Sequence, residues 1–248
     1  MYKRILVGYL ENDPGHDALA LGTALAGATG AELIAVTAPD EQGHGLAALA
    51  RSHEADLIVL GPTHRSGLGR VIPGSTLEHL LGEAPCAVAV APAGFAASGD
   101  DPAMRVVGVG YDASPAAAQA LESAKELALR NGAAMRVYAV APKHPQLPGA
   151  ESPSPGKSLP SEAEELREAL HEAVAKLPSE ARALPVFSRG WPAEELVKAS
   201  ASGVDLLFLG SRSGGPLRRA LHNSISNGVI LRALCPVLVV PTEIAAPA

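Results

Sequence analysis

Short runs of apolar residues alternate with longer segments rich in Ala, Leu, Glu and Lys, most clearly in the C-terminal half of the chain. Each run is short enough for a strand buried on both faces, and each longer segment has the composition of a helix. The predicted strands lie near 105–111, 134–140, 184–188, 205–210 and 236–241, and the predicted helices at about 115–131, at about 161–177, just after 192 and at about 224–233. Strands that alternate with helices predict right-handed βαβ units on an open parallel sheet, and hence an α/β fold.

The N-terminal half repeats this order. Three strand-like segments return in sequence: 5–9 as 106–111, 56–61 as 205–210, and 84–90 as 233–240. Such a repeat indicates a duplicated structural unit. We therefore predict two tandem domains, 1–93 and 104–243, joined by a linker at 94–103 that is rich in small and turn-forming residues.

The first copy is shorter than the second. Between its second strand, near 32–38, and the strand that ends at Gly61 there is room for one helix, at roughly 46–53. The same interval of the second copy also holds a Pro-rich loop at 141–160, a helix and a strand. We therefore predict about four strands in the first domain and five in the second.

The loop after Gly61 has the features of an anion site. In an open parallel sheet a ligand sits beyond the carboxyl ends of the strands, where the strand order reverses. Ser75 and Glu78 have the spacing of a capping box, so a helix is predicted to begin at Ser75. The N–H groups and the dipole of a helix start favour phosphate, and Gly74 lets backbone approach closely. A glycine turn followed by an ordinary helix cap explains the same residues equally well.

The strand, the spaced loop and the closing strand together resemble universal stress proteins of the nucleotide-binding kind, as a tandem pair. Those proteins carry Gly, two residues, Gly, nine residues and then Gly-Ser or Gly-Thr, after a strand that reads like Asp-Leu-Ile-Val-Leu-Gly. The first copy matches at Gly61, Gly74 and Ser75, with Thr76 following, but has His64 in place of a glycine. The resemblance implies that the matching residues contact a nucleotide.

The second copy matches this loop less well. Gly210 and Ser224 are present, whereas Ser213 and Asn223 stand where the family has glycines. Asn tolerates left-handed backbone angles better than most residues, and Ser224 can still cap a helix.

The resemblance also assigns a nucleoside side to the pocket. The family uses an Asp just after the first strand, which reaches the ribose or base, and a Val at the end of the second strand, against adenine. In the second copy these are Asp112 and Val140, but the first copy has Leu10 and Ala38 there. An Asx turn or a helix cap explains Asp112 equally well.

The fold and function follow from the resemblance as expectations. It implies two Rossmann-like domains of the adenine-nucleotide alpha hydrolase-like kind, whose final strands pair as an internal pseudo-dimer, with room for further association into a homodimer. It implies a stress-response protein that binds ATP or AMP, with Mg²⁺ if the ligand is ATP, and acts as a sensor or regulator. The alternative is a nucleotide-free interaction scaffold with degenerate pockets.

Composition limits the classes of binding partner that we expect. The net charge of −6 gives no broad basic surface, so no nucleic-acid partner is expected. No run approaches the roughly 20 apolar residues of a membrane span, and the N-terminus has no secretory signal, so we expect a cytoplasmic protein without membrane contact. The two cysteines do not have the spacing of metal ligands or of a disulfide framework.

The chain has no phosphate-loop, nucleophile-elbow or His-Glu-x-x-His motif, so we expect no metal, no catalytic residue and at most slow incidental ATP hydrolysis.

Overall fold

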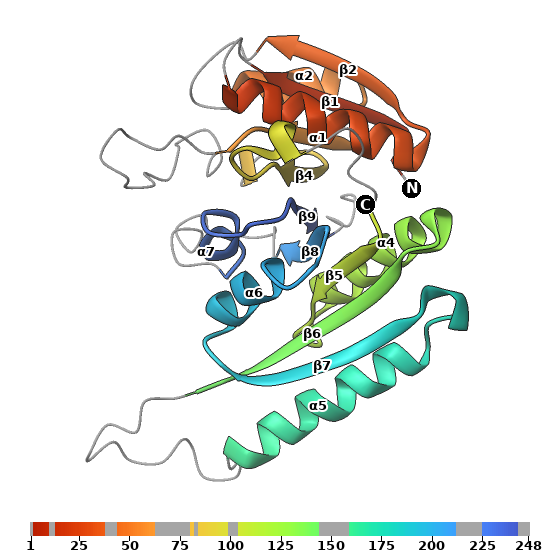
Figure 1. Ribbon diagram of the computed structural model, residues 1–248, viewed down its shortest axis with the longest axis vertical. Coiled ribbons are helices and arrows are strands. Elements are labelled where there is room, and N and C mark those ends of the chain that lie inside the picture. Colours follow the sequence, from red (N-terminus) through yellow and green to blue (C-terminus); the bar gives the residue numbers. More distant parts are fainter. Residues whose placement is uncertain are drawn as a thin grey trace, which may run out of the picture.

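The computed structural model describes residues 2–9, 13–37, 44–62, 80–81, 84–98, 104–143, 159–211 and 225–242. Within them the strands form one nine-stranded sheet in the order β2-β1-β3-β4-β9-β8-β5-β6-β7. In Figure 1 the sheet runs from β2 at the top to β7 at the bottom, with helices packed on both of its faces. The α/β architecture expected from the sequence is therefore confirmed.

The two halves contribute four and five strands, as predicted. The first half contains β1 (Arg4–Tyr9), α1 (Asp13–Thr29), β2 (Glu32–Thr37), α2 (His44–Ser52), β3 (Leu57–Leu60), β4 (Ala87–Val90) and the 3₁₀ helix η1 (Phe95–Ser98). The second half contains β5 (Val106–Gly110), α4 (Pro115–Asn131), β6 (Ala134–Pro142), α5 (Leu159–Ala175), the 3₁₀ helix η2 (Ser179–Ala181), β7 (Ala183–Gly190), α6 (Pro192–Ser200), β8 (Leu206–Ser211), α7 (Ile225–Ile230) and β9 (Val237–Pro241). The second half thus has one strand, β7, and one helix, α5, that the described part of the first half lacks.

Two strands are longer than their apolar runs. β6 continues to Pro142 and β7 spans Ala183–Gly190, because the two strands pair in parallel from Met135 and Ala183 through to Pro142 and Gly190. Backbone hydrogen bonds with a neighbouring strand do not depend on an apolar side chain, so this pairing extends both strands beyond the runs that predicted them.

The two halves join at an antiparallel pair, β4 with β9, whereas every other strand pair in the sheet is parallel. Ala89 lies opposite Leu238, with Val88 opposite Val239. The repeat that aligns Cys86 with Cys235 also aligns Ala89 with Leu238. Ala89 therefore pairs with its own counterpart in the second half. A pseudo-two-fold axis therefore passes through this pair, and the expected pairing of the final strands is present.

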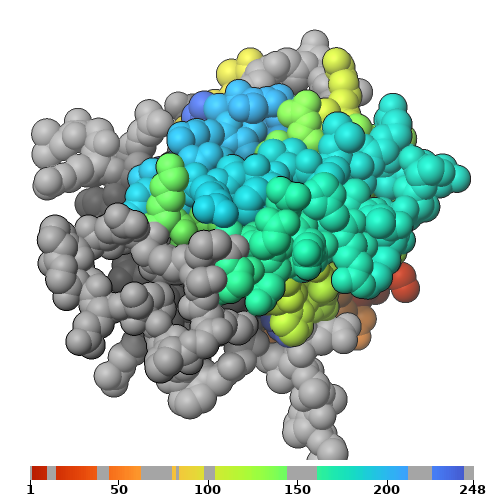
Figure 2. Space-filling model, turned by 90° about the horizontal axis from the view of Figure 1, so that it is seen from below, coloured from red at the N-terminus to blue at the C-terminus, as the bar shows by residue number. Residues whose placement is uncertain are grey.

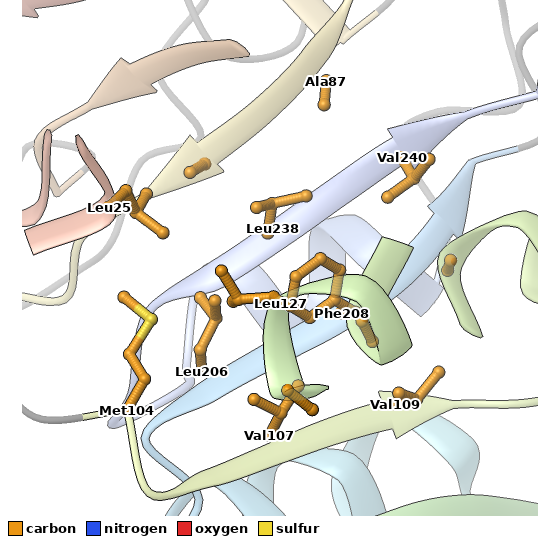
Figure 3. Packing of buried hydrophobic residues seen from close by; sticks show 14 of the residues in the cluster. Leu25, Ala87, Met104, Val107, Val109, Leu127, Leu206, Phe208, Leu238 and Val240 are labelled. Atoms are coloured by element: carbon orange, nitrogen blue, oxygen red, sulfur yellow. The ribbon is translucent and has the colours of Figure 1, made fainter. Parts of the chain in front are cut away.

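The core continues from one half into the other. On one face of the sheet, Leu25 of α1, Leu127 of α4 and Leu170 of α5 belong to a single cluster of buried residues. Figure 3 shows side chains from both halves within it, with Leu127 beside Phe208 and Leu25 nearby. The helices α2, α6 and α7 cover the other face through a second cluster. Burying this apolar area supplies most of the free energy that favours the folded state.

The start of the predicted linker is packed rather than loose. Asp17 of α1 is 4% exposed, and its carboxylate accepts hydrogen bonds from the Gly94 and Ala96 N–H groups at 2.9 and 2.8 Å. A buried carboxylate needs such donors to offset the loss of hydration. Asp17 therefore fixes η1 against α1, where the chain leaves the first half, while the domain boundaries stay predictions.

No helix in the described part of the chain combines the length and apolar character needed to cross a bilayer.

Candidate functional site

The strand order reverses between β5 and β8, because β6 and β7 lie on one side of β5 whereas β8 and β9 lie on the other. Val109 of β5 is level with Val137 of β6 and with Phe208 of β8. Three residues further along, the same register brings Asp112, Val140 and Ser211 to one level at the carboxyl edge. The crevice at such a point is where open α/β sheets bind ligands. The structure thus brings Asp112, Val140 and the end of β8 together.

Asp112 forms the turn that leads from β5 into α4. Its Oδ1 accepts a hydrogen bond from the Ser114 N–H at 3.1 Å, and Ser114 Oγ in turn accepts from the Ala117 N–H at 3.2 Å as the N-cap of α4. Ala113, between them, has a φ of 60°, a left-handed conformation that costs a non-glycine residue roughly 1 kcal/mol. The Asx-turn interpretation of Asp112 is confirmed, and the side chain is also exposed at the crevice.

Gly210 packs against the first turn of α4. A Cβ atom on Gly210 would lie 2.4 Å from the carbonyl carbon and oxygen of Ala116 and 2.7 Å from the Ala117 nitrogen. Only glycine allows this approach without a backbone shift. Helix–strand packing therefore accounts for Gly210 whether or not a phosphate binds nearby.

Val140 lies on the side of β6 that faces α6. Ala139 and Ala141, its neighbours in the strand, are buried, whereas Val140 is half-buried. Alternation along the strand puts Val140 on the same face as Tyr138, which packs with the cluster under α6 and α7. A half-buried apolar side chain at this level offers a surface for a flat aromatic ligand.

The remaining predicted site residues are divided between the first half and the undescribed loops. Gly61 is half-buried directly after β3, and the β1–β3 register makes it level with Tyr9. Gly74, Ser75, Thr76 and Ser224 lie outside the described residues, as do Leu10, Ala38, His64, Ser213 and Asn223.

Tyr111 precedes Asp112 in the chain, and its side chain packs with the cluster on the face of the sheet that α4 and α5 cover. Burial raises the pKa of its hydroxyl, and the carboxylates of Glu172 and Asp112 raise it further, while Lys176 acts in the opposite direction. The phenol is therefore neutral at ordinary pH and can donate a hydrogen bond. Among the described residues, no group of three or more His, Cys, Asp or Glu is placed to hold a metal ion.

Asp56 and Asp205, the first residues of two repeated segments, lie at the opposite, amino-terminal edge of the sheet. Asp56 accepts hydrogen bonds from the N–H groups of Lys3 and Arg4 at 2.8 and 3.1 Å. Asp205 accepts from the Arg105 and Val106 N–H groups, both at 2.8 Å. Each therefore connects the start of a strand to the neighbouring first strand of its half, and the signal in the sequence was an acid at the same place in both copies.

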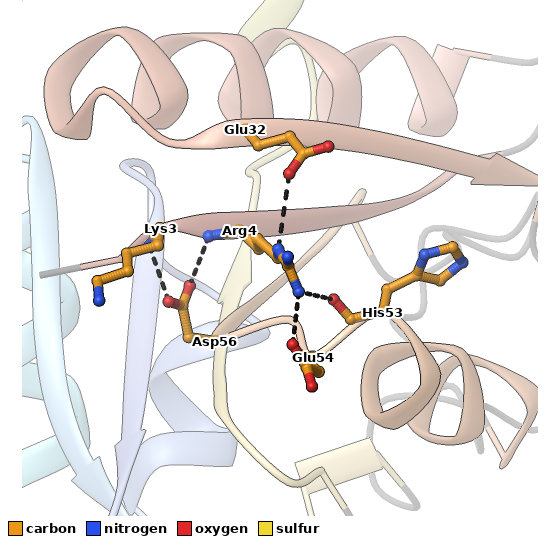
Figure 4. Close-up of polar contacts among 6 residues, drawn as sticks. All are labelled: Lys3, Arg4, Glu32, His53, Glu54 and Asp56. Atoms are coloured by element: carbon orange, nitrogen blue, oxygen red, sulfur yellow. Dashed lines mark hydrogen bonds and ion pairs between the residues drawn. The ribbon is translucent and has the colours of Figure 1, made fainter.

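Around Asp56 the contacts extend into a small ionic group, drawn in Figure 4. Arg4 pairs with Glu54 at 2.7 Å and with Glu32 at 3.6 Å, and it donates to the His53 carbonyl at 3.2 Å. Exposed pairs of this kind contribute little to stability. We therefore assign a structural role to Asp56 and to the ionic group around it.

Comparison with known proteins places the chain in a family. A sequence profile of the Universal stress protein family matches residues 40–92 and 104–241. Universal stress protein Rv2005c of Mycobacterium tuberculosis is 34% identical over 192 residues, which are 76% of this chain and 62% of that protein. Universal stress protein Rv2319c of the same species is 29% identical over 201 residues, covering 79% of this chain and 68% of the relative. This chain thus spans about three fifths of the length of the first relative.

Solved structures agree on the fold. A functionally unknown protein, PA1789, from Pseudomonas aeruginosa superimposes with a TM-score of 0.69 at 16% identity, over 97% of this chain and 92% of that one. A universal stress protein from Archaeoglobus fulgidus gives 0.58 at 19% identity, over 96% and 86% of the two chains. With the profile matching both halves, and the duplicated sheet joined at β4 and β9, the chain belongs to the universal stress protein family.

Proposed function

We propose that this chain is a cytoplasmic stress-response protein that binds an adenine nucleotide in its second half and acts as a sensor or regulator rather than as an enzyme. The observation that carries the proposal is the convergence of Asp112, Val140 and the end of β8 at the point where the strand order reverses. The family resemblance assigns the nucleoside to Asp112 and Val140, and the phosphates to the loop that follows Gly210.

Each residue at this edge has a chemical role in the proposal. The Asp112 carboxylate accepts hydrogen bonds from ribose hydroxyls, and the turn with Ser114 holds it in place. Val140 provides an apolar contact for adenine. The phosphates extend toward the loop after Gly210, and ATP brings Mg²⁺ with its triphosphate.

Titration calorimetry with ATP, ADP and AMP, each with and without Mg²⁺, tests the proposal. We expect heat of binding and a rise in melting temperature, because a ligand that binds only the folded state stabilises it. Absence of both at millimolar nucleotide would rule out the proposed site.

A pair of variants separates the ligand role of Asp112 from its turn role. Asp112→Asn keeps an oxygen that accepts from Ser114 but removes the charge, so it should weaken binding roughly tenfold while the melting temperature stays the same. Asp112→Ala removes the turn as well, so it should lower both the nucleotide affinity and the melting temperature. If Asp112→Asn binds nucleotide as well as the parent chain does, the carboxylate does not contact the ligand.

One observation favours the nucleotide-free scaffold as the second candidate. Gly210 and Asp112, both named for ligand contact, already have structural roles against α4. The scaffold predicts that Asp112→Ala alters stability only and that no nucleotide changes the melting temperature.

A further inference from the structure

The duplication shows what is missing beside β2. α1 and α4 are each 17 residues long and begin 102 positions apart, so β2 corresponds to β6. In the second half β6 is paired with β7 on its outer side and α5 packs on both strands. Among the described residues β2, in contrast, is the last strand of the sheet. Figure 2, seen from the β7 end, shows the surface of α5 and β7 closing that end of the molecule.

The face of β2 that corresponds to the α5-covered face of β6 is open. Met135, Val137 and Ala139 of β6 are all 0% exposed. Their counterparts in β2, Leu33, Ala35 and Thr37, are all exposed, with Leu33 at 37%.

The neighbouring surface of α1 continues this open face. Gly22 of α1 packs close to the Leu33 side chain, so helix and strand form one surface. Leu19 and Ala26 are half-buried here, whereas their α4 counterparts are buried, at 5% for Leu121 and 0% for Ala128. We call the surface formed by Leu19, Thr23, Ala26, Leu33, Ala35 and Thr37 the β2 face.

The β2 face carries no charge. No charged residue occurs from 18 to 31, whereas the matching stretch of α4 contains Glu122, Lys125, Glu126 and Arg130. Thr23 stands where α4 has Lys125, and its hydroxyl donates to the Leu19 carbonyl of its own helix at 2.8 Å. Solvent-facing helices normally carry charge on the outer side, so this departure indicates a covered surface.

β2 also lacks the features that protect edge strands from pairing. Proteins guard an exposed edge with charges and proline. At the other end of the sheet β7 contains Pro185 and an exposed Arg189. In β2 the one charged residue is Glu32, at the start of the strand and paired with Arg4 at 3.6 Å.

We propose that the β2 face binds a second copy of this chain, through antiparallel pairing of β2 with the same strand of the partner. A two-fold contact brings each residue near its own counterpart, so a charged surface would repel itself, and the β2 face is uncharged. The two-fold contact also closes on itself, whereas pairing β2 with β7 of another copy would continue into a filament.

The register of the contact follows from the faces of the strand. A register in which Ala35 lies opposite its own counterpart, with Leu33 opposite the partner's Thr37, keeps the open faces of both copies on one side of the sheet, and it is the register that we propose. The molecule already joins its halves in this way, at Ala89 and Leu238 of β4 and β9.

Light scattering across a dilution series tests the proposal. We expect the parent chain to have twice its mass of 25.2 kDa at high concentration. Ala35→Glu should move the dissociation midpoint at least tenfold upward, because two carboxylates would meet at the axis. Leu184→Glu, at an exposed leucine of β7, is the matched control and should leave the mass unchanged.

Cross-linking gives a second measurement that does not depend on destabilising the dimer. Ala35→Cys should form a covalent dimer under mild oxidation, since opposed residues of antiparallel strands are within disulfide range. Leu184→Cys should not. A single-chain mass at every concentration, or a dimer that is equally sensitive to both Glu variants, would overturn the proposal.

Discussion

At the scale of single residues, Asp56 and Asp205 show how an acid that is repeated in both copies can be structural. Each accepts two backbone N–H groups at the amino-terminal edge of the sheet, far from the crevice at the carboxyl edge. Carboxylates bonded in this way hold the first strand of each half in register with its neighbour.

Asp205→Ala is expected to lower the free energy of unfolding by about 1–3 kcal/mol, because two N–H donors lose a charged acceptor. Asp205→Asn should lower it less, since the amide oxygen still accepts. Urea unfolding measures both. Equal and negligible losses in the two variants would contradict the role, and neither variant should alter nucleotide affinity.

At the scale of elements, the site depends on how α4 meets the sheet. Its first turn rests on the end of β8, and Ser114 and Asp112 set the direction in which it leaves β5. The packing of a helix start against a glycine therefore shapes this edge of the sheet.

Gly210→Ala is expected to destabilise the fold by about 1–3 kcal/mol, because the added methyl group overlaps the Ala116 backbone. Gly228→Ala in α7 is the control: its Cβ would be 3.4 Å from the Ala193 Cβ, and alanine is favoured over glycine in helices. Thermal unfolding of the two variants should change in opposite directions. A neutral Gly210→Ala would mean that the backbone contact is easily relaxed.

Most elements could be predicted from the sequence, because buried parallel strands are continuous apolar runs and the duplication repeats them. The structural role of Gly210 could not be predicted, since a glycine that binds phosphate and a glycine that packs on a helix look the same in a sequence. Asp17 was also missed, because its donors at 94 and 96 are distant in the chain and one of them is a glycine in the left-handed conformation. Such long-range partners become visible only when the chain is folded.

At the scale of the whole molecule, the central strands β4 and β9 are each preceded by a cysteine in an apolar setting. Burial raises the pKa of both the Cys86 and the Cys235 thiol to about 12. Both thiols therefore stay protonated and unreactive at neutral pH, as expected of small buried apolar residues.

The molecule is expected to lose stability between about pH 9 and pH 12. In that range the unfolded chain ionises its thiols while the folded chain does not, so the raised pKa values favour unfolding as the pH increases. For each thiol, the free energy of unfolding falls by at most about 1.4 kcal/mol per pH unit. Chemical unfolding at a series of pH values measures it, and Cys235→Ala should have a shallower slope. A parent chain with flat stability over this range would show that the thiols ionise while folded.

The pairing of Ala89 with Leu238 has a consequence for how such a molecule can change over time. In an assembly of identical chains, one gene specifies both sides of a two-fold axis, so a large residue there must face another large one. Here both positions are fully buried, and a small side chain faces a larger one. Fusion into a single chain lets each side mutate independently, and the same freedom allows the described part of one half to lack a helix and a strand that the other half has.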